Sequence, residues 1–398
     1  MEIQLPDNDH RRLGRDLKLF HLQEDAAGSV FWHPRGYELF RIIEEYIRTK
    51  LKRDGYQEVK TPQLYDRSLW EKSGHWDKFQ DNMYVLEDEQ RPFGLKPMNC
   101  PGHVQIFNSD LVSYRQLPMR LAEFGCCHRS EPSGALHGIM RVRQFTQDDA
   151  HIFCEPQHVV SEVERFVLLL KEVYRDFGFE DVVVGLSTRP EKRAGSDADW
   201  DIAERDLAEA VQSAGLNYEL QPGEGAFYGP KLEFALKDLK GRQWQCGTIQ
   251  LDMVLPQLLD AQYVASDGSR QRPVMLHRAI LGSIERFIGI LLEHYEGNLP
   301  FWLCPENVVV IPLQGGEQAA QGFVELAREQ GARVILDDRD EHLKQKIKEH
   351  SELKRNWIVV IGKRDVEKGV VSVRELGKAH AVEKIAGLAL MEIQSLCK

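Results

Sequence analysis

Two segments with alternating apolar and polar residues, separated by a turn-rich loop, constrain the fold of this chain more than any other feature. They lie within residues 120–153, RLAEFGCCHRSEPSGALHGIMRVRQFTQDDAHIF. Residues 121–124 and 141–145 alternate as half-buried antiparallel strands do, and the Pro-Ser-Gly sequence at 132–134 favours a turn between them. The four arginines and three histidines make the stretch too polar for a plain core hairpin. We therefore expect paired strands with charged groups at their ends.

Three of these charged residues, Arg129, Glu131 and Arg141, are expected at or near the strand ends, facing one side of the hairpin. Guanidinium groups are planar, permanently charged and matched in geometry to oxyanions, which makes the hairpin a candidate nucleotide-phosphate site. The alternative is a solvated hairpin held by surface salt bridges. The charge pattern alone does not choose between the two.

The composition bounds the class of protein. The chain has 398 residues, 42% hydrophobic and 28% charged, which is ordinary globular composition with room for two cores. A formal net charge of -11 argues against non-specific coating of nucleic acid, so any RNA site must be a local basic patch. Seven cysteines without zinc-ribbon spacing suit free thiols in a reducing compartment. No apolar run reaches membrane-spanning length, and we expect a soluble, cytoplasmic protein without membrane contact.

Hydrophobic periodicity predicts the elements of the first part of the chain. Apolar residues recur at helical spacing in three segments, 37–53, 159–177 and 277–294. A charged connection and a surface helix are expected in 192–212, and strands in 56–59 and 181–186. Strand signals dominate the remaining stretch up to Asp252.

From Asn298 onward the pattern changes to alternating strands and helices. Four short segments read as strands, 308–311, 333–336, 357–361 and 370–373. The helices expected between and after them are 317–330, 341–354 and 381–397. This alternation predicts a small mixed or parallel sheet with flanking helices. We therefore expect two domains, 1–300 and 301–398.

The segment CHRSEP at residues 127–132 resembles motif 2 of the class II aminoacyl-tRNA synthetases, in the form that threonyl-tRNA synthetases carry. The similarity extends over nearly the whole chain, through KPMNCPGHVQIFN, RVRQFTQDDAHIF, GEGAFYGPKLEF, QCGTIQLD and VMLHRAILGSIERF. It implies an α+β fold with the class II antiparallel sheet and flanking helices, followed by a small α/β anticodon-binding-type domain. Residues 37–59 resemble motif 1, through which these enzymes form homodimers. Periodicity alone would allow an intramolecular core helix there.

The resemblance implies partners and the residues that bind them. The partners are ATP with Mg²⁺, L-threonine and a tRNA. The implied ATP-binding residues are Arg129, Glu131, Arg141, Phe145, Gln245, Thr248 and Arg286. Arg129 would contact the α-phosphate and the amino-acid carboxylate, while Phe145 would stack on adenine. Lys231 would join the phosphate or carboxylate cluster as a catalytic residue.

The resemblance also implies one Zn²⁺ per chain, held by Cys100, His151 and His277. Their spacing says nothing of a metal, and taken singly each is more often a packed cysteine or a hydrogen-bonded histidine. Three protein ligands leave an open position on zinc. A metal that ligates the amino and hydroxyl groups of threonine would exclude valine, which a hydrophobic pocket separates from threonine by only about a hundredfold.

Residues that resemble the threonine-binding set of the family are Gln147, Asp149, Tyr228 and Gln250. Without the motif, Asp149 and its neighbour Asp148 would be interpreted as a surface acid pair. His75 matches the histidine thought to deprotonate the terminal ribose hydroxyl of tRNA, and an ordinary imidazole pKa suits a general base at neutral pH. Without the match it would be a histidine in an exposed turn.

The chain also departs from the family pattern. It begins at the catalytic core, so we expect neither the N-terminal domain nor editing in cis. Asp340, His342 and Glu375 stand where the family has amide or basic residues that face RNA, and Gln144 stands where it often has glycine. The expected function is threonyl-tRNA synthesis. The alternatives are threonine transfer to another acceptor, such as a carrier protein or a specialised tRNA, and a regulatory RNA-binding role without catalysis.

Overall fold

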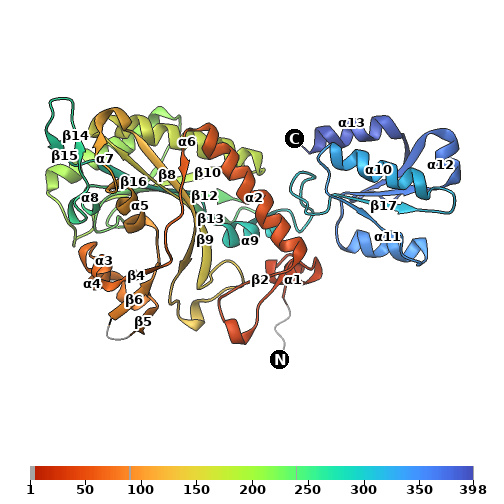
Figure 1. Ribbon diagram of the computed structural model, residues 1–398, viewed down its shortest axis with the longest axis horizontal. Helices are drawn as coiled ribbons and strands as arrows, with labels where there is room; N and C mark the ends of the chain where they lie inside the picture. The colour runs from red at the N-terminus through yellow and green to blue at the C-terminus, as the bar shows by residue number, and fades with distance from the viewer. Residues whose placement is uncertain (1–4, 89–90, 239, 398) are drawn as a thin grey trace. The chain divides into compact units, whose positions relative to one another are not determined.

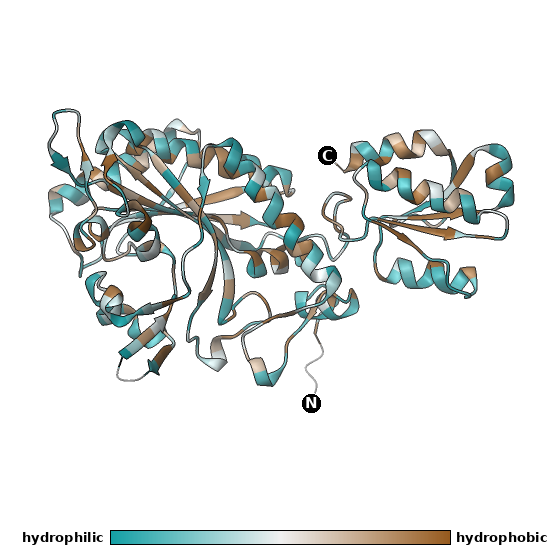
Figure 2. Ribbon diagram, in the orientation of Figure 1, coloured by the Kyte–Doolittle hydropathy of each residue, from teal (hydrophilic) through white to brown (hydrophobic). Residues whose placement is uncertain are grey.

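The computed structural model describes residues 5–88, 91–238 and 240–397 and divides into two compact units (Figure 1). One unit combines segments 25–29 and 44–287. The other combines segments 5–24 and 30–43 with everything described after residue 287. In both, the strands are largely apolar and the helices carry polar outer faces (Figure 2). Among the described residues, no helix is long and apolar enough to cross a membrane.

The larger unit is built on an eight-stranded sheet. From edge to edge its strands are β11 (Glu219–Gln221), β10 (Val182–Ser187), β12 (Lys231–Lys237), β13 (Gln243–Asp252), β16 (Val274–Ser283), β9 (Gln144–Cys154), β8 (Met119–His128) and β3 (Gln57–Glu58). All neighbours are antiparallel except the edge pairs β10–β11 and β3–β8. The hairpin prediction is confirmed by β8 and β9, although β9 begins at Gln144 rather than at Arg141.

Helices and small sheets surround this sheet. The helices are α3 (Arg67–Lys72), α4 (His75–Phe79), α5 (Cys100–Phe107), α6 (Val159–Asp176), α7 (Asp197–Ser213) and α8 (Leu255–Leu258). One small sheet contains β4 (Leu64–Asp66), β6 (Arg91–Leu95) and β5 (Val85–Asp88); another contains β15 (Arg270–Gln271), β14 (Tyr263–Val264) and β7 (Val112–Ser113). Short 3₁₀ turns occupy Glu24–Ala26, Gln80–Asn82, Tyr114–Gln116, Ser133–Ala135 and Pro156–His158.

Helix α6 closes one face of the sheet with a continuous apolar stripe. Phe166 meets Phe234 of β12 edge to face at 5.9 Å, and both side chains are fully buried. Each such burial contributes about 1.5 to 3 kcal/mol. The Tyr174 hydroxyl donates to the carbonyl of Ile280, which ties α6 to β16. This face is therefore filled mainly with apolar core, whereas Lys231, Gln250, His277 and His151 of the central strands lie on the opposite face.

The predicted helix over 277–294 is wrong in its first half. Residues Val274–Ser283 form strand β16, and helix α9 begins only at Ile284 and ends at His294. A central strand buried on both faces carries a nearly continuous apolar run, which periodicity does not distinguish from a buried helix. Gly282, next to the last residue of the strand, has a φ of +84°, a left-handed conformation that favours glycine.

The second unit contains a five-stranded sheet in the order β18-β17-β19-β20-β21. Its strands are β17 (Val308–Pro312), β18 (Val334–Leu336), β19 (Trp357–Ile361), β20 (Val370–Glu375) and β21 (Val382–Ile385). Its helices are α10 (Glu317–Glu329), α11 (Leu343–Glu352), α12 (Lys363–Lys368) and α13 (Ala386–Leu396). Strands β18, β17 and β19 are parallel and the other two antiparallel, so the predicted mixed sheet is confirmed. Helix α12 was not predicted, and the helix expected over 381–397 begins only at Ala386, because strand β21 occupies Val382–Ile385.

The N-terminal part of the chain adds four elements: α1 (His10–Asp16), β1 (Phe20–His21), β2 (Phe31–Trp32) and α2 (Pro34–Arg53). The predicted helix over 37–53 is therefore present and begins one turn earlier, at a proline whose fixed φ suits the first helical position. Buried Leu39, Ile43, Ile47 and Leu51 recur on one face of α2, as the periodicity indicated.

Candidate active site

Strand register assembles the candidate site on the open face of the large sheet. Directly opposed residues of neighbouring strands lie on the same face, so a row of partners crosses the sheet. One row contains Lys231, Gln250, His277 and His151. The next row contains Glu233, Thr248, Ala279, Asp149 and Glu123. The site residues predicted from the sequence that lie on this face are Gln147, Asp149, His151, Lys231, Thr248, Gln250 and His277.

The three predicted metal ligands meet at the end of the first row. One ligand atom each from Cys100, His151 and His277 lies within 4.8 Å of the others. His151 Nε2 and His277 Nδ1 are 3.0 Å apart, and Cys100 enters from the first turn of α5. A thiol and two imidazoles form a donor set that Zn²⁺ prefers, so these residues fit that ion. Burial raises the pKa of the Cys100 thiol, which a cation would oppose.

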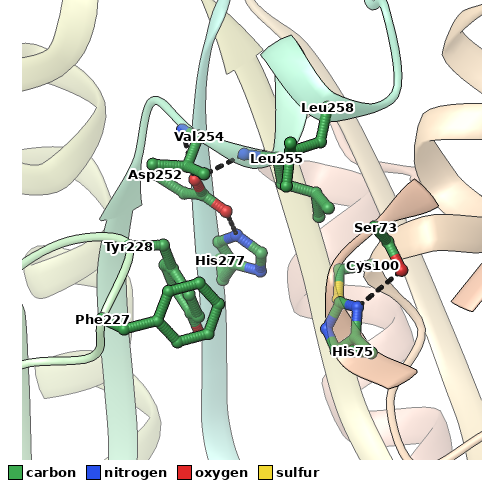
Figure 3. Close-up of a pocket in the computed structure, with 10 residues that line it drawn as sticks. All are labelled: Ser73, His75, Cys100, Phe227, Tyr228, Asp252, Val254, Leu255, Leu258 and His277. Carbon is green, nitrogen blue, oxygen red and sulfur yellow. Dashed lines mark hydrogen bonds and ion pairs between the residues drawn. The ribbon is translucent and has the colours of Figure 1, made fainter. Parts of the chain in front are cut away.

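His75 lies beside this cluster in a pocket formed by segments far apart in the sequence (Figure 3). Its Nε2 is 3.9 Å from Cys100 Sγ, and its Nδ1 is 2.8 Å from the Ser73 hydroxyl. Ser73 donates its one hydrogen to the carbonyl of Trp70 and must therefore accept from His75 Nδ1. The Nε2 lone pair is consequently left free to accept a proton.

His75 departs from the expectation of an exposed histidine with an ordinary pKa. Its exposed fraction is 8%, and burial lowers its pKa to about 4. The imidazole is therefore neutral at physiological pH. Phe227, Tyr228, Asp252 and Leu255 line the other side of the pocket (Figure 3).

Three of the predicted threonine-binding residues, Tyr228, Gln250 and Asp149, form hydrogen bonds with neighbouring side chains. The Tyr228 hydroxyl donates to Gln250 Oε1 at 2.5 Å. Asn99 donates from Nδ2 to Asp149 Oδ2 at 2.9 Å, and a side chain at Gly125 would collide with the Asn99 amide, so only glycine fits there. Burial raises the pKa of Asp149.

Asp148 and Asp149 are not a surface pair, because both are buried. They point to opposite faces of β9, as neighbours in a strand do. Asp148 accepts from the backbone N–H groups of Ile280, Leu281 and Gly282 at 2.8 to 3.1 Å. It therefore fixes the end of β16, whereas Asp149 faces the metal-ligand cluster.

The charged hairpin residues form a second group, at the end of β8. The Arg129 guanidinium lies 5.0 Å from the centre of the Phe145 ring and donates to the carbonyl of Pro97 at 3.2 Å. The carboxylate of Glu131 binds Arg141 at 2.9 Å, and the Arg141 side chain is 56% exposed. This pair is a salt bridge near the surface, whereas Arg129 is half-buried.

The remaining predicted nucleotide residues lie along β12, β13 and the start of α9. Glu233 binds Lys231 Nζ at 2.6 Å and Gln245 Nε2 at 2.5 Å. Arg286 donates to the carbonyl of Gln245 at 3.2 Å. The Thr248 hydroxyl is buried and has no hydrogen-bond partner among the described residues. These groups border a polar surface that suits an anionic, hydrogen-bonding ligand.

Comparison with known proteins identifies the family in which this arrangement of residues occurs. Residues 84–295 match the family described as tRNA synthetase class II core domain (G, H, P, S and T), and residues 307–391 match the anticodon binding domain. A crystal structure of the RNA binding domain of threonyl-tRNA synthetase from Cryptosporidium parvum is 39% identical, with a TM-score of 0.91, and each chain covers 98% of the other. This chain belongs to the threonyl-tRNA synthetase family.

Other members of the family agree. The threonine–tRNA ligase of Thiobacillus denitrificans is 58% identical over 370 residues, which are 93% of this chain and 58% of that protein. The putative threonyl-tRNA synthetase ThrRS-1 of Aeropyrum pernix is 30% identical with a TM-score of 0.82, over 98% of this chain and 96% of that one. The chain thus spans little more than half the length of the curated relatives it matches. The class II fold expected from motif 2 is confirmed.

In this family member, the anticodon-binding unit presents a groove along α11 and β20. His342, Lys344, Lys348, Ser351 and Arg374 are among the residues that line it. Of the two acids noted in the sequence, Asp340 is exposed, whereas Glu375 binds Lys384 at 2.9 Å. The charge of Glu375 is therefore partly compensated within the unit.

Sequence reasoning missed several residues that support the synthetase site. They are Ser73, Asn99, His103, Glu123 and Asp252. Each acts through a side-chain contact that spacing does not reveal. In the sequence, these residues could have been noticed only because they lie near matched motif residues. His103, for example, ends the segment CPGH that begins with Cys100.

Proposed function

We propose that this chain activates L-threonine with ATP and transfers the threonyl group to the 3′ end of threonine tRNA. The observation that carries the proposal is the convergence of Cys100, His151 and His277 beside Asp149 on one face of a class II sheet. The comparisons support the same reaction and give no support to a carrier-protein acceptor or to a regulatory role without catalysis.

In the proposed amino-acid site, Cys100, His151 and His277 hold one Zn²⁺. The bound ion would supply a Lewis acid for the amino and hydroxyl groups of threonine, which valine cannot match. Asp149, oriented by Asn99, accepts a hydrogen bond from the amino group. Gln147, Tyr228 and Gln250 contact the hydroxyl and carboxylate.

In the activation step, a threonine carboxylate oxygen attacks the α-phosphorus of ATP, the new O–P bond forms and pyrophosphate leaves. Arg129 neutralises the charge that develops between the two anions, and Lys231 supports it. Adenine stacks on Phe145, with its amino group at Glu131. Gln245 and Thr248 complete the nucleotide contacts. Arg141 and Arg286 bind the far phosphates, for which Arg141 must leave its present partner Glu131.

In the transfer step, a ribose hydroxyl of the terminal tRNA nucleotide attacks the threonyl carbonyl, and AMP leaves. The hydroxyl proton passes to Nε2 of His75. Ser73 holds the opposite nitrogen of the ring, so the accepting lone pair is aimed into the pocket. Burial of His75 keeps the ring neutral and able to accept a proton.

Several further features belong to the proposal. The chain works as a homodimer through motif 1, Mg²⁺ accompanies ATP, and the enzyme acts in the cytoplasm. The catalytic domain spans residues 1–300 and the anticodon-binding domain residues 301–398. The family matches over 84–295 and 307–391 support that division.

The test is attachment of labelled threonine to threonine tRNA by the purified chain with ATP. Wild-type protein should form threonyl-tRNA, and Arg129→Ala should reduce the rate by at least about a hundredfold, as expected when one charge-stabilising donor is lost. Arg115→Ala is the matched control, because Arg115 is exposed and its side chain contacts Tyr114, its neighbour in the chain, outside the proposed site. Transfer of threonine to a carrier protein but not to tRNA would contradict the proposal.

A further inference from the structure

A chain of buried polar groups lies behind the metal-ligand cluster, and the proposed reaction does not use it. Lys96, Glu123 and His103 are 1%, 4% and 0% exposed. Glu123 binds Lys96 Nζ at 2.9 Å and His103 Nε2 at 3.1 Å, and it also accepts from both the N–H and the hydroxyl of Thr61. Burying charged groups costs free energy even when they are paired. A function of these buried groups would account for that cost.

The hydrogen bonds from Glu123 through His103 to His151 determine which ring nitrogen of His151 carries the hydrogen. Glu123 is an acceptor, because hydrogen bonds from His103 and Lys96 outweigh its burial and lower its pKa to about 2. His103 therefore donates from Nε2 and, when neutral, offers Nδ1 as an acceptor. His103 Nδ1 lies 2.8 Å from His151 Nδ1. In the arrangement where His103 Nδ1 accepts, His151 donates from Nδ1, and its Nε2 then has a lone pair that can bind a metal.

Asp252 determines the hydrogen position of His277 in the same way. Its Oδ1 accepts from the backbone N–H groups of Val254 and Leu255 at 2.7 and 2.9 Å. Its Oδ2 lies 2.9 Å from His277 Nε2 (Figure 3). The carboxylate has no hydrogen to give, so His277 donates from Nε2. Its Nδ1 is then left with a lone pair.

The two nitrogens left without hydrogen are the pair that face each other at 3.0 Å, His151 Nε2 and His277 Nδ1. Two lone pairs at that separation repel unless a cation lies against both. We propose that Glu123 with His103, and Asp252, form an outer shell that presents His151 Nε2, His277 Nδ1 and Cys100 Sγ to one zinc-like divalent cation. The inference rests on the metal site of the proposed function, and it adds the ligand atoms and the positioning residues.

The substitution Asp252→Asn tests the outer shell directly. The backbone N–H groups of Val254 and Leu255 hold the amide oxygen of the new side chain, so its NH₂ group faces His277 Nε2. That nitrogen must then accept, and the hydrogen moves to Nδ1, where it blocks the metal. Zinc affinity, measured by competition with a chromophoric chelator, should fall about 10- to 100-fold. A change of less than about twofold would overturn the inference.

The matched control is Asp267→Asn. Asp267 also accepts the backbone N–H two residues further on, at 2.8 Å from Ser269, but belongs to an exposed turn. Its zinc affinity should equal that of the wild type. Circular dichroism of both variants checks that the fold is kept.

If Asp252→Asn does not fold, the metal-binding nitrogen atoms can still be identified in the wild-type protein. The chain is loaded with an NMR-active cadmium isotope and isotope-labelled histidine. Scalar coupling to cadmium should appear at Nδ1 of one histidine and at Nε2 of another. Coupling to the same ring nitrogen in both residues, or no binding of zinc or cadmium, would overturn the inference.

These experiments need no substrate, so they separate the inference from the proposed function. A chain that binds metal as described but does not activate threonine would contradict the function alone. A chain that activates threonine while Asp252→Asn holds zinc as the wild type does would contradict the outer shell alone.

Discussion

His151 Nε2 and His277 Nδ1 face each other at 3.0 Å although their residues are 126 positions apart in the chain. The antiparallel pairing of β9 with β16 sets them directly opposite each other. A slip of one residue in that pairing would turn one ring to the other face of the sheet. Asp148 opposes such a slip, because it holds three successive backbone N–H groups at the end of β16.

The first prediction concerns metal content. Freshly purified protein should contain about one zinc per chain, as expected for a site with three protein ligands. Cys100→Ala should lose the metal and, with it, most of the discrimination against valine. Cys126→Ala is the control, since Cys126 is a half-buried cysteine outside the cluster. Full activity in metal-free protein, checked by elemental analysis, would count against the site.

The second prediction concerns Ser73. Ser73→Ala removes the acceptor for His75 Nδ1, so the ring loses its preferred orientation. Transfer to tRNA should slow by about tenfold, within the range that general bases contribute, while formation of the adenylate stays unchanged. Ser73→Thr keeps the hydroxyl and should restore transfer. Single-turnover kinetics of the two steps make the distinction; equal loss in both steps would indicate a merely structural role.

The third prediction is a pH dependence of stability. Glu285 is buried, and burial raises its pKa from the ordinary 4.5 to about 7. A raised carboxyl pKa contributes stability that is fully present below pH 4.5 and is lost as the pH rises through about 7. Relative to Glu285→Gln, the wild type should lose up to roughly 3 kcal/mol across that window. Urea midpoints that run parallel for the two proteins from pH 4.5 to 8 would contradict this.

The fold could be predicted further than the site. Alternation identified β8 and β9. Helical periodicity identified α6 to within one residue and α2 except for its first turn. It failed over 277–294, where a strand buried on both faces is as apolar as a helix. For the site, motif resemblance supplied the residues and strand register brought them together. The residues that hold the site residues by hydrogen bonds could not be predicted. A contact such as that of Asp252 with His277 exists only once β13 and β16 pair.

The fourth prediction concerns serine. A site that tests for an amino group and a neighbouring hydroxyl accepts serine, and the missing methyl group costs only about 1 to 3 kcal/mol. Serine should therefore be activated roughly 10- to 200-fold less efficiently than threonine. The measurement is kcat/KM for the two amino acids in the adenylation reaction. Rejection of serine by more than about ten thousandfold would require a contact to the methyl group that this account lacks.

The most direct test of the central claim is amino-acid-dependent exchange of pyrophosphate into ATP by the zinc-loaded chain. Exchange should depend on threonine, proceed weakly with serine and fall more than about a hundredfold with valine, which lacks the hydroxyl. The exchange needs no tRNA, so it examines the metal-organised amino-acid site alone. Exchange that valine supports as well as threonine, or no exchange with threonine, would contradict the account.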